Sequence, residues 1–98
     1  MKPVSFHPLV EEELAEIISY YRTVSGARLA DNLQHEFFNF IDLARSTPGR
    51  FHCVQDSVRR ANLKRFPYHF LFIEKPDRIR VLVVRHHSRH PTFGIDRT

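Results

Sequence analysis

The segment VRRANLKRFPYHFLFIEKPDRIRVLVVRHHSRHPTFGIDR, residues Val58–Arg97, decides the fold because it holds two long apolar runs joined by a tight turn. Tyr68–Glu74 is apolar at both alternating sets of positions, which predicts a central strand buried on both faces. Lys75–Asp77 carries the proline and aspartate typical of a turn, and Ile79–Arg85 follows as the next strand. We therefore expect an antiparallel hairpin in the middle of a sheet.

The residues just before this hairpin are more polar. Ser57–Arg65 predicts a strand of mixed character, and Phe66-Pro67 interrupts it because proline cannot donate to a sheet ladder. Gly49–Asp56 shows no clear period, and we expect it to form a loop.

The first half of the chain has the period of helices. Val4–Phe6 is expected to form a short strand, and Pro8 suits the first turn of a helix, where a missing N–H costs nothing. One apolar face of this helix consists of Val10, Leu14, Ile17, Ile18 and Tyr21. Ser25-Gly26 ends it. A second helix runs from about Ala27 to Thr47, and its apolar face consists of Leu29, Leu33, Phe37, Phe40, Ile41 and Ala44.

The order of these elements predicts one α+β domain over residues 1–98. Its elements follow the order β-α-α-β-β-β, with the helical hairpin packed on an antiparallel sheet. Opposed layers bury helix faces of period 3.6 and strand faces of period two at once. We expect one apolar cluster between the layers, made of Leu14, Ile17, Tyr21, Leu33, Phe37, Phe40, Phe70, Phe72, Val81 and Val83.

Charge is unevenly divided between the halves of the chain. Residues 1–49 hold four Lys/Arg against seven Asp/Glu, whereas residues 50–98 hold eleven against four and five of the seven histidines. The halves therefore carry −3 and +7, which favours an anionic partner for the second half.

Composition also indicates the compartment. The single cysteine, Cys53, excludes an internal disulfide and suits a reducing environment. No apolar run approaches the roughly 18 residues of a membrane span, and the first residues lack the layout of a signal peptide. We expect a small cytoplasmic protein.

Several kinds of chemistry have little support in the sequence. His86 and His87 are adjacent on a predicted strand, so they point to opposite faces and cannot easily share a metal ion. No serine lies in a glycine-rich elbow, Cys53 has no evident activator, and the three glycines make no phosphate loop. We expect no metal and no cofactor.

The basic and imidazole side chains of the second half remain as candidates: Arg59, Arg60, Lys64, Arg65, Arg85, His86, His87, Arg89, His90 and Arg97. Arginine binds phosphates and carboxylates bidentately, and histidine can move protons near neutral pH. These residue types suffice for metal-independent RNA cleavage, in which Tyr68 or Phe93 could stack on a base. An alternative for Arg60 is a scaffold role, pairing with a helix carboxylate such as Glu36.

With these residues in place, the chain resembles the RelE/ParE superfamily of toxins from bacterial toxin–antitoxin modules, often called plasmid stabilisation proteins. Phe6-His7-Pro8, Glu11–Leu14 and Tyr20-Tyr21 resemble the opening of the family. Arg60, Leu63 and Arg65-Phe66-Pro67-Tyr68 resemble its central signature. His86, Arg89, Pro91 and Arg97 resemble its C-terminal pattern.

The resemblance implies a growth-inhibiting toxin that a cognate antitoxin neutralises, and it leaves three activities open. A ParE-like toxin poisons DNA gyrase, and Phe66-Pro67-Tyr68 leans toward this branch. A RelE-like toxin cleaves mRNA at the ribosome, with Arg65 and His87 as catalytic residues. The third alternative is an inactive relative that binds nucleic acid. The target-binding residues would be Arg59, Arg60, Lys64, Arg85, His86, Arg89 and Arg97.

The resemblance also implies how the antitoxin binds. A disordered acidic and apolar segment of the antitoxin would fold across the toxin, with the helical hairpin and a sheet edge as its landing surface. An exposed aromatic side chain on the second helix, such as Phe38, would favour this arrangement.

Overall fold

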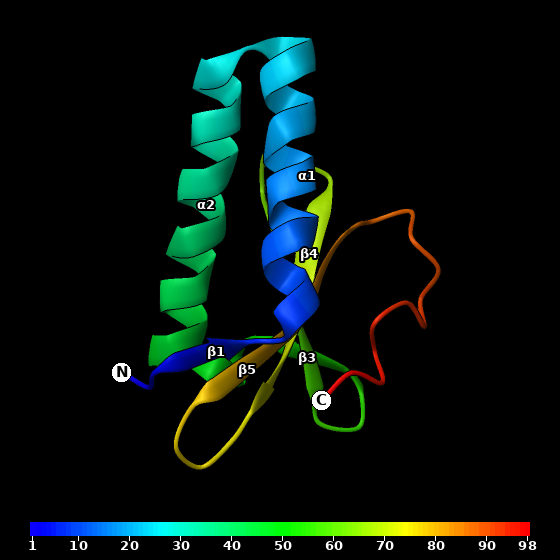
Figure 1. Cartoon of the computed structure of the whole chain (residues 1–98). Coiled ribbons are helices and arrows are strands. Elements are labelled where there is room, and N and C mark those ends of the chain that lie inside the picture. Colours follow the sequence, from blue (N-terminus) through cyan, green and yellow to red (C-terminus); the bar gives the residue numbers. More distant parts are fainter.

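The computed structural model describes all residues from Met1 to Thr98. Two long helices form a hairpin that stands against one face of a sheet, and the turn between them extends beyond it (Figure 1). The elements are β1 (Val4–Phe6), α1 (Pro8–Ser25), α2 (Ala27–Ser46), the 3₁₀ turn η1 (Pro48–Arg50), β2 (His52–Gln55), β3 (Val58–Asn62), β4 (Tyr68–Glu74) and β5 (Ile79–His86). The predicted α+β class and helical hairpin are confirmed. Neither helix is long and apolar enough to cross a membrane.

The sheet is mixed, with the strand order β1-β5-β4-β3-β2. β2 to β5 form an antiparallel meander, but β1 pairs parallel to β5, with Val4 opposite Ile79. Without β1 the buried strand β5 would be an edge with unpaired backbone groups, and such groups are costly to bury. The parallel pairing therefore makes β5 an interior strand, which the sequence pattern of β1 alone could not reveal.

A strand also forms where the sequence predicted a loop. The expected loop Gly49–Asp56 contains η1 and β2, and β2 pairs antiparallel with β3 as the far edge of the sheet. All four residues of β2 are exposed, so it carries no alternation of apolar and polar positions by which a strand is recognised.

The helix boundaries agree with the sequence prediction. His7 caps α1, because its Nδ1 accepts the N–H of Leu9 at 3.1 Å, and Pro8 follows at the first helical position. Gly26 joins the helices with a φ of 93°, a backbone conformation that favours glycine. Thr47 ends α2, where its N–H and its hydroxyl both donate to the carbonyl of Leu43.

The apolar core lies on both faces of the sheet rather than in one cluster. The helix-side cluster contains Val10, Phe37, Ile41, Ala44, Ala61, Phe70, Phe72, Ile79, Val81 and Val84, and it touches Leu14, Ile17 and Phe40. A bulge in β5 places Val81 opposite Phe72 and Val83 opposite Leu71. Val83 therefore packs with Leu82 on the far face, and its predicted place in the helix-side cluster was wrong.

A third cluster extends the core along the hairpin. Leu33 packs with Leu63 and Phe66 of the loop between β3 and β4, and Tyr21 packs against this cluster. Leu14, Ile17 and Phe40 touch both this cluster and the helix-side cluster, so the two adjoin. The prediction that Leu33 and Tyr21 share one cluster with Phe70 was therefore wrong, because the loop supplies its own apolar side chains.

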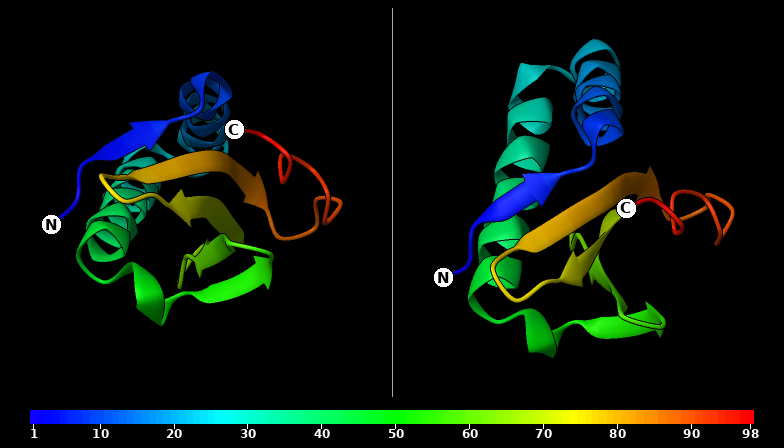
Figure 2. Two further views of the ribbon diagram at one scale, coloured as in Figure 1. Left: turned by 90° about the horizontal axis from the view of Figure 1, so that it is seen from below. Right: turned by 60° about the horizontal axis from the view of Figure 1, so that its bottom comes forward.

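The C-terminal segment covers the far face of the sheet. It leaves the end of β5 and returns towards α1 (Figure 2). Phe93 and Ile95 pack against the cluster of Val58, Leu71, Leu82 and Val83. Between them Gly94 has a φ of 77°, and a Cβ there would lie 2.7 Å from the Cβ of Val83. The segment can approach the sheet this closely because residue 94 has no side chain.

Phe70→Ala should lower the free energy of unfolding by about 3–5 kcal/mol, because it opens a cavity in the middle of the helix-side cluster. Phe70 is fully buried and meets the ring of Phe37 edge-on. Val24→Ala, at a side chain that is 62% exposed, is the control and should change stability by less than about 0.5 kcal/mol. Urea unfolding measures both, and equal losses would contradict the observed layering.

Candidate functional site

Most of the predicted site residues gather at one end of the sheet. Here β3 ends, β4 begins and β5 ends, and the N–H of His87 donates to the carbonyl of Pro67 at 2.9 Å. We call this region the basic end. It consists of Arg60 on β3, Lys64 and Arg65 in the β3–β4 loop, His86 and His87 at the end of β5, and Arg89 in the C-terminal segment.

A chain of hydrogen bonds runs from the core to this surface through two histidines. Nε of Arg85 donates to Nε2 of His69 at 2.8 Å. A guanidinium can only donate, so Nε2 of His69 carries no proton and its neutral ring is protonated at Nδ1. This Nδ1 lies 2.9 Å from Nδ1 of His87, which must therefore accept. Neutral His87 thus carries its proton on Nε2.

Arg60 completes the chain from the neighbouring strand. Its Nη2 lies 3.4 Å from Nδ1 of His87, and its Nε donates to Oδ1 of Asn62 at 2.7 Å. The rings of His69 and His87 are nearly parallel, with an interplanar angle of 15° and centroids 5.1 Å apart, as an edge-to-edge hydrogen bond requires. The orientation of His87 is therefore set by donors from two strands.

The surroundings of both histidines favour their neutral forms. Burial, followed by the charges of Arg60 and Arg85, lowers the pKa of His69 to about 3. Although His87 is exposed as a residue, partial desolvation of its ring, followed by the charges of Arg60 and His86, lowers its pKa. Burial also lowers the pKa of Arg85, although a guanidinium remains protonated in proteins.

Arg85 was predicted to bind the target, but the structure buries it. The residue is 5% exposed, and beside the bond to His69 its Nη1 donates to the carbonyls of His90, Pro91 and Phe93. Arg85 therefore clamps the C-terminal segment onto the sheet and is not available at the surface.

Arg97 and Arg59 are also engaged by the fold. Nη1 of Arg97 bonds Oε2 of Glu13 at 2.9 Å and the carbonyl of Leu82 at 3.1 Å, which ties the end of the chain to α1 and β5. Nη1 of Arg59 donates to the carbonyl of Phe51 at 2.7 Å. Both side chains position backbone, although the sequence placed them on a target-binding surface.

Arg65, and not Arg60, pairs with Glu36. Oε2 of Glu36 accepts the N–H groups of Lys64 and Arg65, and its Oε1 bonds Nε of Arg65 at 3.1 Å. Burial raises the pKa of this carboxyl, but the hydrogen bonds from Arg65 and Lys64 outweigh burial, and the net pKa is lowered. Glu36 thus holds the β3–β4 loop on α2, while the Arg65 side chain remains 67% exposed.

The other members of the basic end face solvent more freely. Lys64 and Arg89 are exposed, and the guanidinium of Arg89 lies 4.0 Å from the ring centroid of Phe93. Nδ1 of His86 accepts the N–H of Ser88, and its ring meets the half-buried Tyr68 edge-on. Stacking of a base on either aromatic ring would have to displace one of these contacts.

Sequence reasoning missed His69, the residue that links the core to the basic end. It sits in the most apolar strand, where a histidine is easily taken for a tolerated polar residue. The register of β4 against β5 places His69 opposite Arg85. The pairing of His69 with Arg85 across the strands would have identified His69, but it can be recognised only when the register of β4 against β5 is known.

No group of three or more His, Cys, Asp or Glu side chains is placed to hold a metal ion. Cys53 is exposed on β2.

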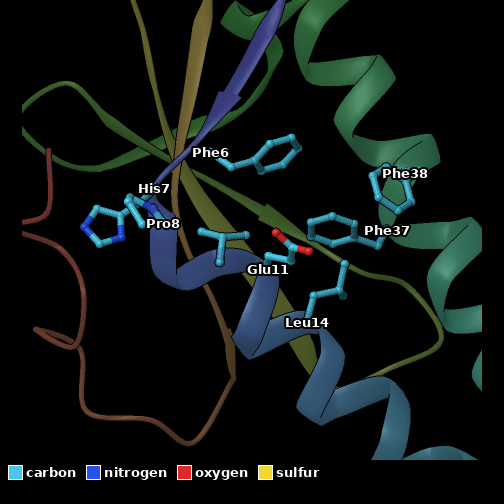
Figure 3. Close-up of a pocket in the computed structure, with 8 residues that line it drawn as sticks. Phe6, His7, Pro8, Glu11, Leu14, Phe37 and Phe38 are labelled. Carbon is cyan, nitrogen blue, oxygen red and sulfur yellow. The ribbon is translucent and has the colours of Figure 1, made fainter.

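A second feature is a pocket of about 380 Å³ at the foot of the helical hairpin. The side chains of Phe6, Leu14, Phe37 and Phe38 surround it, with the carboxylate of Glu11 at its mouth and His7 pointing away (Figure 3). Phe38 is 42% exposed, as the sequence analysis required of an antitoxin contact. The pocket offers apolar surface on the acidic half of the chain.

A helical hairpin on a mixed sheet with a basic end is the architecture expected of a small RelE/ParE-like toxin. Residues 4–91 match a family model described as the ParE toxin of the type II toxin–antitoxin system parDE. The chain therefore belongs to the ParE toxin family and is the toxin of a type II toxin–antitoxin system.

A solved structure, described as the chromosomal ParDE TA system from P. aeruginosa, has the same fold. The TM-score is 0.76 at 17% sequence identity, over 88% of this chain and 96% of that chain. No curated protein matches.

Arg85→Ala should lower the free energy of unfolding by about 2–4 kcal/mol, because it leaves Nε2 of His69 and the carbonyls of the tail without their charged donor. Arg89→Ala is the control. It should cost less than about 1 kcal/mol, the worth of an exposed cation–π contact. Thermal and urea unfolding measure the stability of both variants. An Arg85→Ala protein as stable as the parent would contradict the proposed clamping role of Arg85.

Acid should destabilise the protein through His69. Between its ordinary pKa of 6.5 and its folded pKa of about 3, the unfolded chain binds a proton that the folded chain does not. The free energy of unfolding therefore falls as the pH decreases, by up to about 1.4 kcal/mol per pH unit from this group. Urea unfolding between about pH 6.5 and pH 4.5 measures the slope.

His69→Gln should flatten this dependence, and His52→Gln, at an exposed position on β2, should not. His87 acts in the same direction because its pKa is also lowered. An unchanged slope in His69→Gln would mean that His69 is charged in the folded protein.

Proposed function

We propose that this toxin inhibits growth in the cytoplasm by binding and poisoning DNA gyrase through its basic end and helical arm. The observation that carries the choice is that Nδ1 of His87 faces donors from both His69 and Arg60. Its Nδ1 lone pair accepts from His69 and Arg60, and its Nε2 carries the proton. A neutral imidazole in this state has no free lone pair with which to deprotonate a 2′-OH. The surface is thus built to donate hydrogen bonds, as a binding site does.

The ribonuclease alternative rests on Arg65 and His87, which both lie at the basic end. Arg65 is partly committed to Glu36, and His87 lacks a free base nitrogen. The family model favours the same choice, since it describes a ParE toxin. Cleavage by this pair would require the hydrogen bond between the histidines to break first.

Induced expression without antitoxin should arrest growth with a DNA-damage response while translation continues. The purified protein should trap gyrase on cleaved DNA. His87→Ala should weaken this effect by no more than about tenfold, the scale of one hydrogen bond, whereas an acid–base group would contribute about 10²-fold or more. Cleavage of mRNA that survives EDTA, with intact replication, would sink the gyrase proposal in favour of the ribonuclease. Folded, harmless protein would sink both.

We also propose that the cognate antitoxin places apolar side chains of a folding segment into the pocket at the foot of the hairpin. The pocket lies between α1 and α2, and its wall includes the exposed Phe38. A segment that folds on binding buries such anchors from one helix face.

Phe38→Glu should weaken binding of the antitoxin encoded in the adjacent reading frame by about tenfold or more, because a carboxylate cannot enter an apolar contact unpaired. Val24→Glu adds the same charge at the exposed tip of the hairpin and should bind normally. Calorimetry measures both affinities. Equal antitoxin affinities of Phe38→Glu and Val24→Glu would mean that the antitoxin does not bind at this pocket.

A further inference from the structure

The proposed function uses His69 only as a donor to His87, although the placement of His69 in the core is costly. It is 1% exposed in the central strand β4 and has no carboxylate partner. A buried polar group is tolerated only when it is hydrogen-bonded, and both nitrogens of His69 are. One bond ends on the buried Arg85, and the other ends on the exposed His87. The buried His69 therefore acts on the protonation and orientation of His87 at the surface.

We propose that the Nε2–H of His87 and the guanidinium of Arg60 are neighbouring donors of a binding site for the phosphate groups of a nucleic-acid strand, with His69 and Arg85 as positioning residues. Arg60 uses Nε on Asn62 and one Nη2 proton on His87, which leaves its other donors without a partner. The site therefore combines a cation on the Nδ1 side of the His87 ring with a neutral N–H donor at Nε2 of the same ring.

The hydrogen-bond chain gives His87 one proton position. A free imidazole exchanges its proton between two nitrogens, so part of its neutral population would present an acceptor to an anion at a given nitrogen. Here Arg85 fixes the tautomer of His69, and His69 fixes that of His87. The outward nitrogen is therefore always a donor, and no reorganisation is needed when an anion binds.

The surroundings favour a phosphate strand over a single carboxylate. Two helix carboxylates near the basic end are already paired, Glu36 with Arg65 and Glu13 with Arg97. Lys64, Arg65 and Arg89 add exposed positive charge around the pair, more than one carboxylate needs but suited to the repeated charge of a nucleic-acid backbone. The inference rests on the proposed function in one respect, since a toxin that acts on gyrase meets DNA.

The first test is spectroscopic and uses the purified wild-type protein. Imidazole ¹H–¹⁵N spectra at neutral pH should show His69 protonated at Nδ1 and His87 protonated at Nε2. Inorganic phosphate, titrated at low salt, should shift the Nε2 resonance of His87 and leave that of His52 in place. A His87 ring protonated at Nδ1, or averaging between tautomers, would overturn the proposal, as would a Nε2 resonance that ignores phosphate.

The second test measures binding of a labelled oligonucleotide to the toxin alone, across a range of salt concentrations. Arg60→Gln should weaken binding by about tenfold and reduce the salt slope by about one. Arg78→Gln is matched for charge and lies at the opposite end of the sheet, in the β4–β5 turn, so it should do neither. Equal effects of the two variants would mean that the protein senses only net charge, and the site would be discarded.

The positioning role has its own variant. His69→Phe keeps a ring but removes the donor to His87 and the acceptor of Arg85 Nε, so it should be less stable. Below its unfolding transition, measured by urea, it should bind the oligonucleotide severalfold more weakly and allow the His87 tautomers to average. Tight binding of a polyglutamate peptide in place of the oligonucleotide, with the same dependence on Arg60, would reassign the site to carboxylates. None of these measurements uses gyrase, so failure here is separate from failure of the proposed function.

Discussion

The buried guanidinium of Arg85 is the group on which the rest of this structure depends. It lies at the end of β5, where the C-terminal segment must cross the far face of the sheet. Its donors reach His69 and the carbonyls of His90, Pro91 and Phe93, so the desolvated charge meets several acceptors and no carboxylate. A planar donor with five N–H groups can join a strand, a neighbouring ring and a tail in this way, whereas a lysine could not.

The same guanidinium also connects the core with the surface. Because it can only donate, it determines which nitrogen of His69 is protonated, and His69 in turn determines the state of His87. The proton on Nε2 of His87 at the basic end is thus a consequence of packing under the tail. Stability and surface chemistry are coupled here, since a change that loosens the tail would also release the His87 imidazole at the basic end.

The elements of the fold were largely predictable, whereas their pairing was not. Tyr68–Glu74 carried enough apolar length to predict its strand to the residue, and Pro8 and the break at Ser25-Gly26 marked the helices. The bulge in β5 could not be predicted from the sequence, because Val81–Val84 is apolar at every position. A shift by one residue therefore leaves no break in an alternating pattern. The parallel pairing of β1 with β5 and the pairing of β2 with β3 could not be predicted either. Both depend on which sheet edges the other strands leave unpaired.

The sequence by itself determined the class of fold, the division of charge between the halves and the residue types of the basic end. Only the tertiary structure decided which of those cations remain at the surface. Arg85, Arg97 and Arg59 bond backbone carbonyls inside the fold, while Lys64, Arg65 and Arg89 stay exposed. The physical reason is that burial and hydrogen bonding act over a few ångströms, between residues such as His69 and His87 that only folding brings together.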